Sequence, residues 1–166
     1  MKIDHKGIGA KVTFENEYSK KYSGGNHNAL FDGWTSPDTM ISIVDYSVLQ
    51  GFQKNDLVAT VDFGKTIEME KISIGFLQYL ESWIFLPEFV EIQFSNDKKN
   101  FKDLRKINRT SSINSTIIFK ENFNFSFQPI TARYLKIHAK SIGNCPSWHQ
   151  GAGEPAWVFA DEVIVN

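Results

Sequence analysis

The chain has 166 residues and a mass of 19.0 kDa, which suits one domain. Its 18 basic and 19 acidic residues nearly balance, so its charge does not favour a nucleic acid or an anionic membrane as partner. No apolar run reaches the roughly 20 residues of a membrane span, and the single cysteine, Cys145, excludes an internal disulfide. The unusual feature is an aromatic content of 14%, with 14 phenylalanines among those residues.

The N-terminal residues 1–9 contain scattered lysines and two glycines, and the pattern indicates a lead-in or linker. They lack the apolar stretch of a secretory signal peptide. We therefore expect a single domain over residues 10–166.

From residue 57 onward the apolar residues alternate with polar ones, a period of two that is typical of strands. The strand-like runs are 57–63, 71–76, 90–95, 116–127, 134–139 and 157–165. No segment of ten or more residues has the pattern of an amphipathic helix. The sequence therefore predicts an all-β fold, with two packed sheets forming a β-sandwich.

Two long segments fall outside the strand pattern, residues 18–55 and 141–156. Both are rich in Gly, Pro, Asn and Trp. Because binding residues often lie on loops that a rigid scaffold positions, we expect function to reside in these segments.

Five short motifs resemble, in order, the discoidin or coagulation factor V/VIII type C domain. They are Ala29–Gly33, Val61–Gly64, Ser95–Asp97 followed by Asn100 and Phe101, Ala132–Ile137, and Asp161–Val165. The resemblance covers roughly residues 20–166. It implies a jelly-roll β-sandwich of about eight core strands.

Further motifs look like the discoidin-type module attached to bacterial β-N-acetylhexosaminidases, or chitobiases, which belongs with family 32 carbohydrate-binding modules. These motifs are Gln50–Phe52, Gly75–Gln78, Ser82–Pro87, Cys145–His149, Gly151–Gly153 and Ala156-Trp157. The likeness implies a non-catalytic, glycan-binding part of such an enzyme, with a catalytic domain upstream and a hexosamine- or galactose-containing partner. It also implies a periplasmic, cell-surface or secreted parent protein.

A calcium site is predicted at the turn Asp32-Gly33, with Glu162 closing it from the last strand. Calcium prefers six to eight oxygen ligands, and a tight turn supplies carboxylate and carbonyl oxygens together. The resemblance adds the carbonyls of Ala29, Trp34 and Asp161, and a hydroxyl five residues after the aspartate. That position holds Pro37, so Thr35 or Ser36 must substitute or the site is incomplete. The alternative is an Asx turn at Asp32 and a solvated Glu162.

A sugar site is predicted around the loop tryptophans, because a sugar ring pairs an aromatic plane for its C–H face with planar polar groups for its hydroxyls. The predicted residues are Trp148, His149, Trp83, Gln78, Glu81 and Trp34. Trp148, flanked by polar and turn residues, is expected to be exposed. The alternative is that these aromatics close the ends of the core.

Three enzymatic readings are weaker. Asp161-Glu162 resembles a pair of hydrolytic carboxylates, but the chain is too short for the barrel that carries that chemistry. Cys145 and His149 could be nucleophile and base or half of a zinc site, but further partners are missing.

Three non-enzymatic alternatives to sugar binding remain: a structural appendage that binds no sugar, a protein-interaction or adhesion module, and a phospholipid-binding module. Acidic loop residues make the last the weakest.

Overall fold

The computed structural model describes residues 1–36 and 44–166, and its strands pair in antiparallel fashion. The strands are β1 (Lys11–Phe14), β2 (Gln50–Gln53), β3 (Leu57–Gln78), β4 (Phe89–Ser95), β5 (Lys102–Asn108), β6 (Phe119–Ala139) and β7 (Trp157–Val165). Four single 3₁₀ turns, η1 (Lys20–Tyr22), η2 (Ala29–Phe31), η3 (Tyr46–Val48) and η4 (Leu80–Ser82), are the helical elements of these described ranges. The all-β prediction is confirmed.

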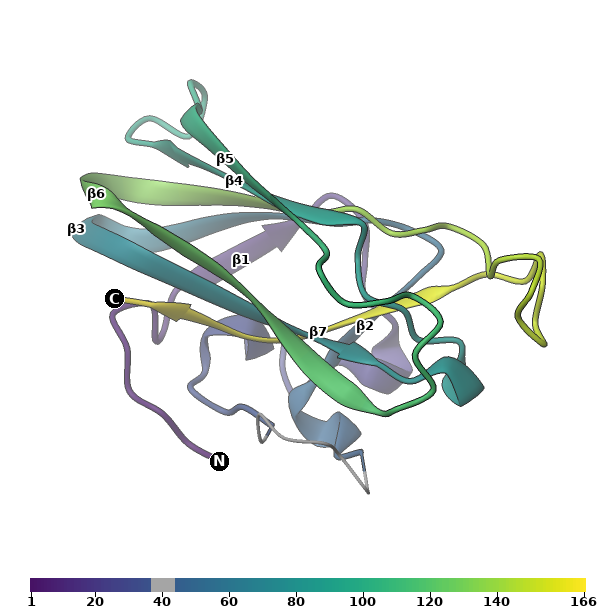
Figure 1. Cartoon of the computed structure of the whole chain (residues 1–166). Helices are drawn as coiled ribbons and strands as arrows, with labels where there is room; N and C mark the ends of the chain where they lie inside the picture. The colour runs from purple at the N-terminus through teal and green to yellow at the C-terminus, as the bar shows by residue number, and fades with distance from the viewer. Residues whose placement is uncertain (37–43) are drawn as a thin grey trace.

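The two long strands β3 and β6 pass through both layers of the molecule and double back at one end of it (Figure 1). The β3–β6 ladder shifts register between Asp62 and Ile67 and again between Met69 and Lys71. Such irregularities bend strands, and Gly64 adopts a positive φ of 77° there. One layer therefore has the order β1-β3-β6-β4-β5, and the other has the order β2-β7-β3-β6.

The core lies between the two layers. Alternate residues of each strand face inward, as the period of two requires. Ring pairs such as Phe76 with Phe123, whose centroids are 5.4 Å apart at 87°, fill the space between the sheets. Many of the phenylalanines therefore stabilise the hydrophobic core and are not exposed to a ligand.

The structure differs from the predicted strands in three ways. The runs 57–63 and 71–76 belong to one continuous strand, β3, and residues 116–118 precede β6. The short edge strands β1, β2 and β5 were not predicted. The described residues form seven strands where about eight core strands were expected, because β3 and β6 each serve both sheets.

Residues 1–9, predicted to be a lead-in or linker, pack against the last strand and the Asp32 turn. The Lys6 backbone N–H donates to the Val165 carbonyl at 2.8 Å, and the Ile3 N–H donates to the Gly33 carbonyl at the same distance. His5 is buried. No helix in the described residues has the length and apolar character needed to cross a membrane.

Candidate functional site

The loop 141–156 projects from the end of the sandwich remote from both chain termini (Figure 1). Its base is closed by three backbone hydrogen bonds: from the Ala156 N–H to the Gly143 carbonyl at 2.9 Å, from the Cys145 N–H to the Glu154 carbonyl at 2.8 Å, and from the Gly153 N–H to the Cys145 carbonyl at 3.0 Å. The loop is therefore an ordered hairpin-like structure.

His149 anchors this loop. Its Nε2 lies 2.7 Å from the Leu80 carbonyl oxygen and must donate to it, while Nδ1 accepts the Gly151 N–H at 2.9 Å. Both ring nitrogens are thus occupied, and the ring is buried. His149 was predicted to contact sugar. In the structure its buried ring instead holds the loop to η4 through hydrogen bonds to the backbone.

Gln78 also lies inside the protein. It is fully buried at the end of β3, and its amide nitrogen donates to backbone carbonyls of the 112–115 segment at 3.1–3.4 Å. The predicted sugar contact from Gln78 is therefore wrong, because the side chain holds a neighbouring loop instead.

Trp148 is exposed, as expected, with 51% of its surface accessible. Its ring contacts Phe85 and His149 in edge-on geometry, with centroids 6.3 and 5.9 Å apart. An exposed ring that is supported from beneath is a preorganised platform, because little side-chain entropy remains to be lost on binding.

Beside this platform lies a shallow groove of about 330 Å³ lined by Gln53, Trp83, Glu154, Pro155 and Trp157. Trp83 contacts His149 at 5.5 Å between centroids, so His149 connects the groove to Trp148. Trp83 has a φ of 59°, an uncommon backbone conformation for a bulky residue, at the end of η4.

Four of the five residues that line the groove were not among the predicted sugar residues. Gln53 ends β2, Glu154 and Pro155 lead into β7, and Gln53 pairs with Trp157 across the β2–β7 ladder. The sequence signal was weak for Gln53 and Glu154, because a polar residue beside a strand end is common. Trp157, the first residue of the predicted strand run 157–165, is half-buried and lines the groove with its accessible side.

The two other predicted sugar residues, Glu81 and Trp34, are exposed, but only Glu81 is close in sequence to a residue of the groove. Glu81 lies in η4, two residues before Trp83. Trp34 lines a different cavity of about 400 Å³, together with Asp32 and Asp45, and the Lys2 ammonium lies 5.8 Å from its ring centroid. The structure therefore does not bring Trp34 into the groove.

Cys145 is poorly placed for nucleophilic or metal chemistry. The thiol is buried, and burial raises its pKa, which disfavours the reactive thiolate. His149 is already committed to two backbone partners. Among the described residues, no group of three His, Cys, Asp or Glu side chains is arranged to hold a metal.

The charge of the buried Asp161 carboxylate is balanced by the Lys120 ammonium. The Lys120 ammonium lies 2.8 Å from Asp161 Oδ2, and both side chains are almost fully buried. Thr35 and Ser36 donate their hydroxyls to the same oxygen at 2.7 and 2.8 Å. The hydroxyl of Ser36, predicted to be a calcium ligand, therefore donates a hydrogen bond to Asp161. Pro37 lies outside the described residues.

Glu162 is also buried, so it is not the solvated residue of the alternative reading. Its Oε1 accepts hydrogen bonds from His5 Nε2 and from the Gly33 N–H, both at 2.8 Å. His5 Nδ1 accepts the N–H groups of Gly7 and Val165, at 3.1 and 3.3 Å, so the proton of this ring belongs on Nε2. A neutral His5 leaves the carboxylate charge of Glu162 uncompensated.

The second oxygen of Glu162, Oε2, is buried without a hydrogen-bond partner within the described ranges. Desolvation raises the pKa of Glu162, against the opposing effect of the hydrogen bond from His5, and the nearby charge of Asp32 raises it further. A cation beside Oε2 would satisfy this oxygen and balance both carboxylates. Asp32 and Glu162 thus fit the predicted metal, whereas the Ser36 hydroxyl is hydrogen-bonded to Asp161. The Asp161 carbonyl stays a predicted ligand.

Asp32 forms the Asx turn that the sequence also allowed. Its Oδ1 accepts the Trp34 N–H, and its Oδ2 accepts the Asn26 amide, both at 2.9 Å. Each carboxylate oxygen has further lone pairs, so the turn and a bound cation are compatible.

Comparison with known proteins decides the family. The sequence profile of the F5/8 type C domain matches residues 11–158, most of the chain. The chain belongs to the F5/8 type C domain family. No curated protein sequence matches this F5/8 type C chain significantly.

Several solved structures share the F5/8 type C fold of the chain. A fucose-binding module of Streptococcus pneumoniae is 15% identical, with a TM-score of 0.58 over 99% of this chain and 98% of that one. The lectin domain of lectinolysin, solved with Lewis B antigen, is 17% identical, with a TM-score of 0.58 over 100% and 98%. A family 32 carbohydrate-binding module of Clostridium perfringens, solved with GalNAc-β-1,3-galactose, is 16% identical, with a TM-score of 0.52 over 93% and 94%.

Proposed function

We propose that the chain is a non-catalytic carbohydrate-binding module whose glycan site combines the Trp148 platform with the adjacent groove. The supporting observation is the exposed ring of Trp148, supported by Phe85 and His149, beside a groove that carries aromatic, amide and carboxylate groups. The aromatic planes suit the C–H face of a sugar, and Gln53 and Glu154 suit its hydroxyls.

The structural neighbours support a glycan as ligand, since one is a fucose-binding module and the others were solved with Lewis B antigen and GalNAc-β-1,3-galactose. We propose a hexosamine- or galactose-containing glycan for this chain. We further propose that the module belongs to a β-N-acetylhexosaminidase and increases the local substrate concentration for a catalytic domain upstream. A site of this kind typically works at a Kd on the order of 1 mM, or about −4 kcal/mol, because linkage to the enzyme multiplies its effect.

The test is a glycan array followed by isothermal titration with the best glycan. Trp148→Ala is expected to weaken binding at least about tenfold, because it removes the stacking surface, which corresponds to about 1.4 kcal/mol. The matched control is Trp34→Ala, which deletes an equally exposed tryptophan in a different cavity and is expected to leave the affinity unchanged. Equal affinity of both variants and the native chain would contradict the site.

A structural or protein-interaction appendage is the second candidate. The exposed platform at the free end of the sandwich would then cover another protein surface. Absence of binding to every glycan on the array, with the fold intact, would favour this candidate.

We also propose that calcium binds between Asp32 and Glu162, with carbonyl oxygens such as those of Ala29 and Trp34 as further ligands. When bound, the ion would link the turn after η2 to β7 by its charge. The support is the buried, unpartnered Oε2 of Glu162 and the raised pKa of that carboxyl.

Calcium is expected to raise the melting temperature at pH 7, relative to a chelator, and to do so less at pH 5. The folded pKa of Glu162 is raised, so without metal its contribution to stability falls as pH rises from about 4.5 through that pKa. Calcium must displace the bound proton, so its effect grows over the same range. Differential scanning calorimetry of the native chain and Glu162→Gln measures this, and an equal calcium response in both would contradict the site.

A further inference from the structure

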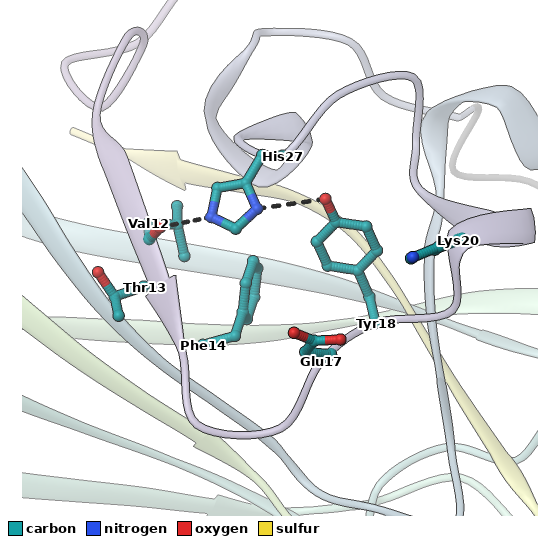
Figure 2. A pocket seen from close by; sticks show the side chains of 7 residues that line it. All are labelled: Val12, Thr13, Phe14, Glu17, Tyr18, Lys20 and His27. Carbon is teal, nitrogen blue, oxygen red and sulfur yellow. Dashed lines mark hydrogen bonds between the residues drawn. The ribbon is translucent and has the colours of Figure 1, made fainter.

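A second cavity lies away from the Trp148 groove, on the side of the sandwich where β1 runs (Figure 2). Its volume is about 320 Å³, at the lower end of the range of small-molecule sites. It lies between the edge strand β1 and the segment that leads through η1 to His27. Phe14, Glu17, Tyr18, Lys20 and His27 are its principal lining residues.

The rings of Phe14, Tyr18 and His27 form one continuous wall of this cavity. Phe14 meets Tyr18 at 5.5 Å and 78°, and it meets His27 at 5.4 Å and 82°. The buried ring of Phe52 supports the wall, with its centroid 5.5 Å from that of Phe14. Because the rings contact one another, they do not form the open cage that a quaternary ammonium group requires. The ammonium of Lys20 at the same cavity also disfavours a cation.

The hydrogen bonds of His27 fix which atoms of the cavity can receive a ligand. His27 Nε2 lies 2.9 Å from the Val12 carbonyl oxygen and must donate to it, which leaves Nδ1 as an acceptor in the neutral ring. The Tyr18 hydroxyl lies 3.2 Å from Nδ1 and donates to it. Figure 2 shows both bonds holding the imidazole above the Phe14 ring. The Tyr18 oxygen therefore keeps free lone pairs that can accept a hydroxyl proton.

Two charged side chains line the same cavity with no partner among residues 1–36 and 44–166. Glu17 supplies two acceptor oxygens, and Lys20 supplies three N–H donors. A sugar ring carries hydroxyls that both donate and accept, together with a C–H face that packs on aromatic rings. One negative and one positive group together favour a neutral ring over a charged one.

We infer that this cavity is a second sugar site, which takes one neutral sugar residue of a glycan. The inference rests on the proposed function only for the class of ligand, a sugar. The location of the site is independent of it, since the two sites share no lining residue. They lie on either side of β2. Phe52 of β2 supports the second site, whereas the next residue, Gln53, lines the groove. Successive side chains of a strand point to opposite faces, so the two residues serve different sites. A module with two sites could hold two branches of one glycan, or two chains.

The test is an NMR titration of the 166-residue chain with galactose, N-acetylgalactosamine, fucose and N-acetylglucosamine, each up to about 50 mM, which saturates a site of millimolar affinity. The reporters are the ring signals of His27 and Tyr18 for the second site, and the Trp148 indole signal for the groove. At least one sugar is expected to shift the His27 and Tyr18 signals. Glu17→Gln and Tyr18→Phe are each expected to weaken that site about threefold to tenfold, the effect of one lost hydrogen bond.

Trp148→Ala is the matched control, and it is expected to leave the second-site affinity unchanged. Silence of His27 and Tyr18 with every sugar would overturn the inference, whatever happens at Trp148. Shifts that persist with equal affinity in both Glu17→Gln and Tyr18→Phe would also overturn it. A silent Trp148 with a responsive His27 would instead contradict the proposed groove and support the second site. Backbone amide spectra of each variant establish that the fold is kept.

Discussion

Replacing Lys120 with alanine is expected to lower the free energy of unfolding by about 3–5 kcal/mol, the range for removing one partner of a buried ion pair. The Lys120 ammonium donates to Asp161 Oδ2 and to the Ser36 carbonyl, both at 2.8 Å, and to the Thr35 hydroxyl at 3.0 Å. Without it, the Asp161 carboxylate stays buried and, within residues 1–36 and 44–166, keeps only the hydrogen bonds from Thr35 and Ser36. Chemical denaturation followed by tryptophan fluorescence measures the loss.

Two further variants separate charge from packing. In the double variant Lys120→Ala/Asp161→Ala the buried charge is also gone, so part of the stability is expected to return. Lys106→Ala removes an exposed lysine that lies 3.8 Å from Glu91, and a change below about 1 kcal/mol is expected for it. If Lys120→Ala were as mild as Lys106→Ala, the buried pair would contribute no more than a surface one.

Replacing Gly151 with alanine is expected to cost about 1–3 kcal/mol, the usual range for overpacking, and to disrupt the groove. A Cβ at this position would lie 1.7 Å from Trp83 Nε1 and 2.4 Å from its Cε2, so the indole must move. Because Trp83 lines the groove and contacts His149, glycan affinity is expected to fall together with stability. Thermal melting and isothermal titration of the same sample measure both effects.

The matched control for Gly151→Ala is Gly153→Asn in the same loop. A Cβ at Gly153 meets no atom within 4 Å, and its φ of 82° is one that asparagine tolerates better than most residues. A smaller effect on both stability and binding is expected. Equal losses in the two variants would mean that any change in this loop is harmful, and that the contact with Trp83 is not the cause.

The period of two made the central strands predictable, because one face of each lies on the core. The short strands β1 and β2 have four residues each, too few to show a period, and most residues of β5 are exposed. These strands were therefore missed. The continuity of β3 was also hidden, because the polar residues around Gly64 look like a turn when the sequence is read locally.

At the candidate site, the sequence indicated which residues are polar or aromatic but not what they bond to. Gln78 and His149 have the chemistry of sugar ligands, yet backbone carbonyls of loops distant in sequence take up their donors. The pairing of Asp161 with Lys120 likewise joins residues 41 positions apart. Trp148 was predictable because the polar and turn residues around it provide nothing to cover its ring. The second cavity was missed, since Phe14 and His27 lie 13 positions apart with no motif between them.

The two long strands also bear on how the chain folds. Because β3 and β6 run through both layers, neither layer contains a complete set of strands until the other has formed. Their paired residues lie far apart in sequence, from Gln78 with Phe119 to Leu57 with Ala139, so the backbone must close long loops before it gains these contacts. Folding is therefore expected to be slow and cooperative. A truncation within β3 or β6 would leave unpaired edges in both sheets, and such edges promote aggregation.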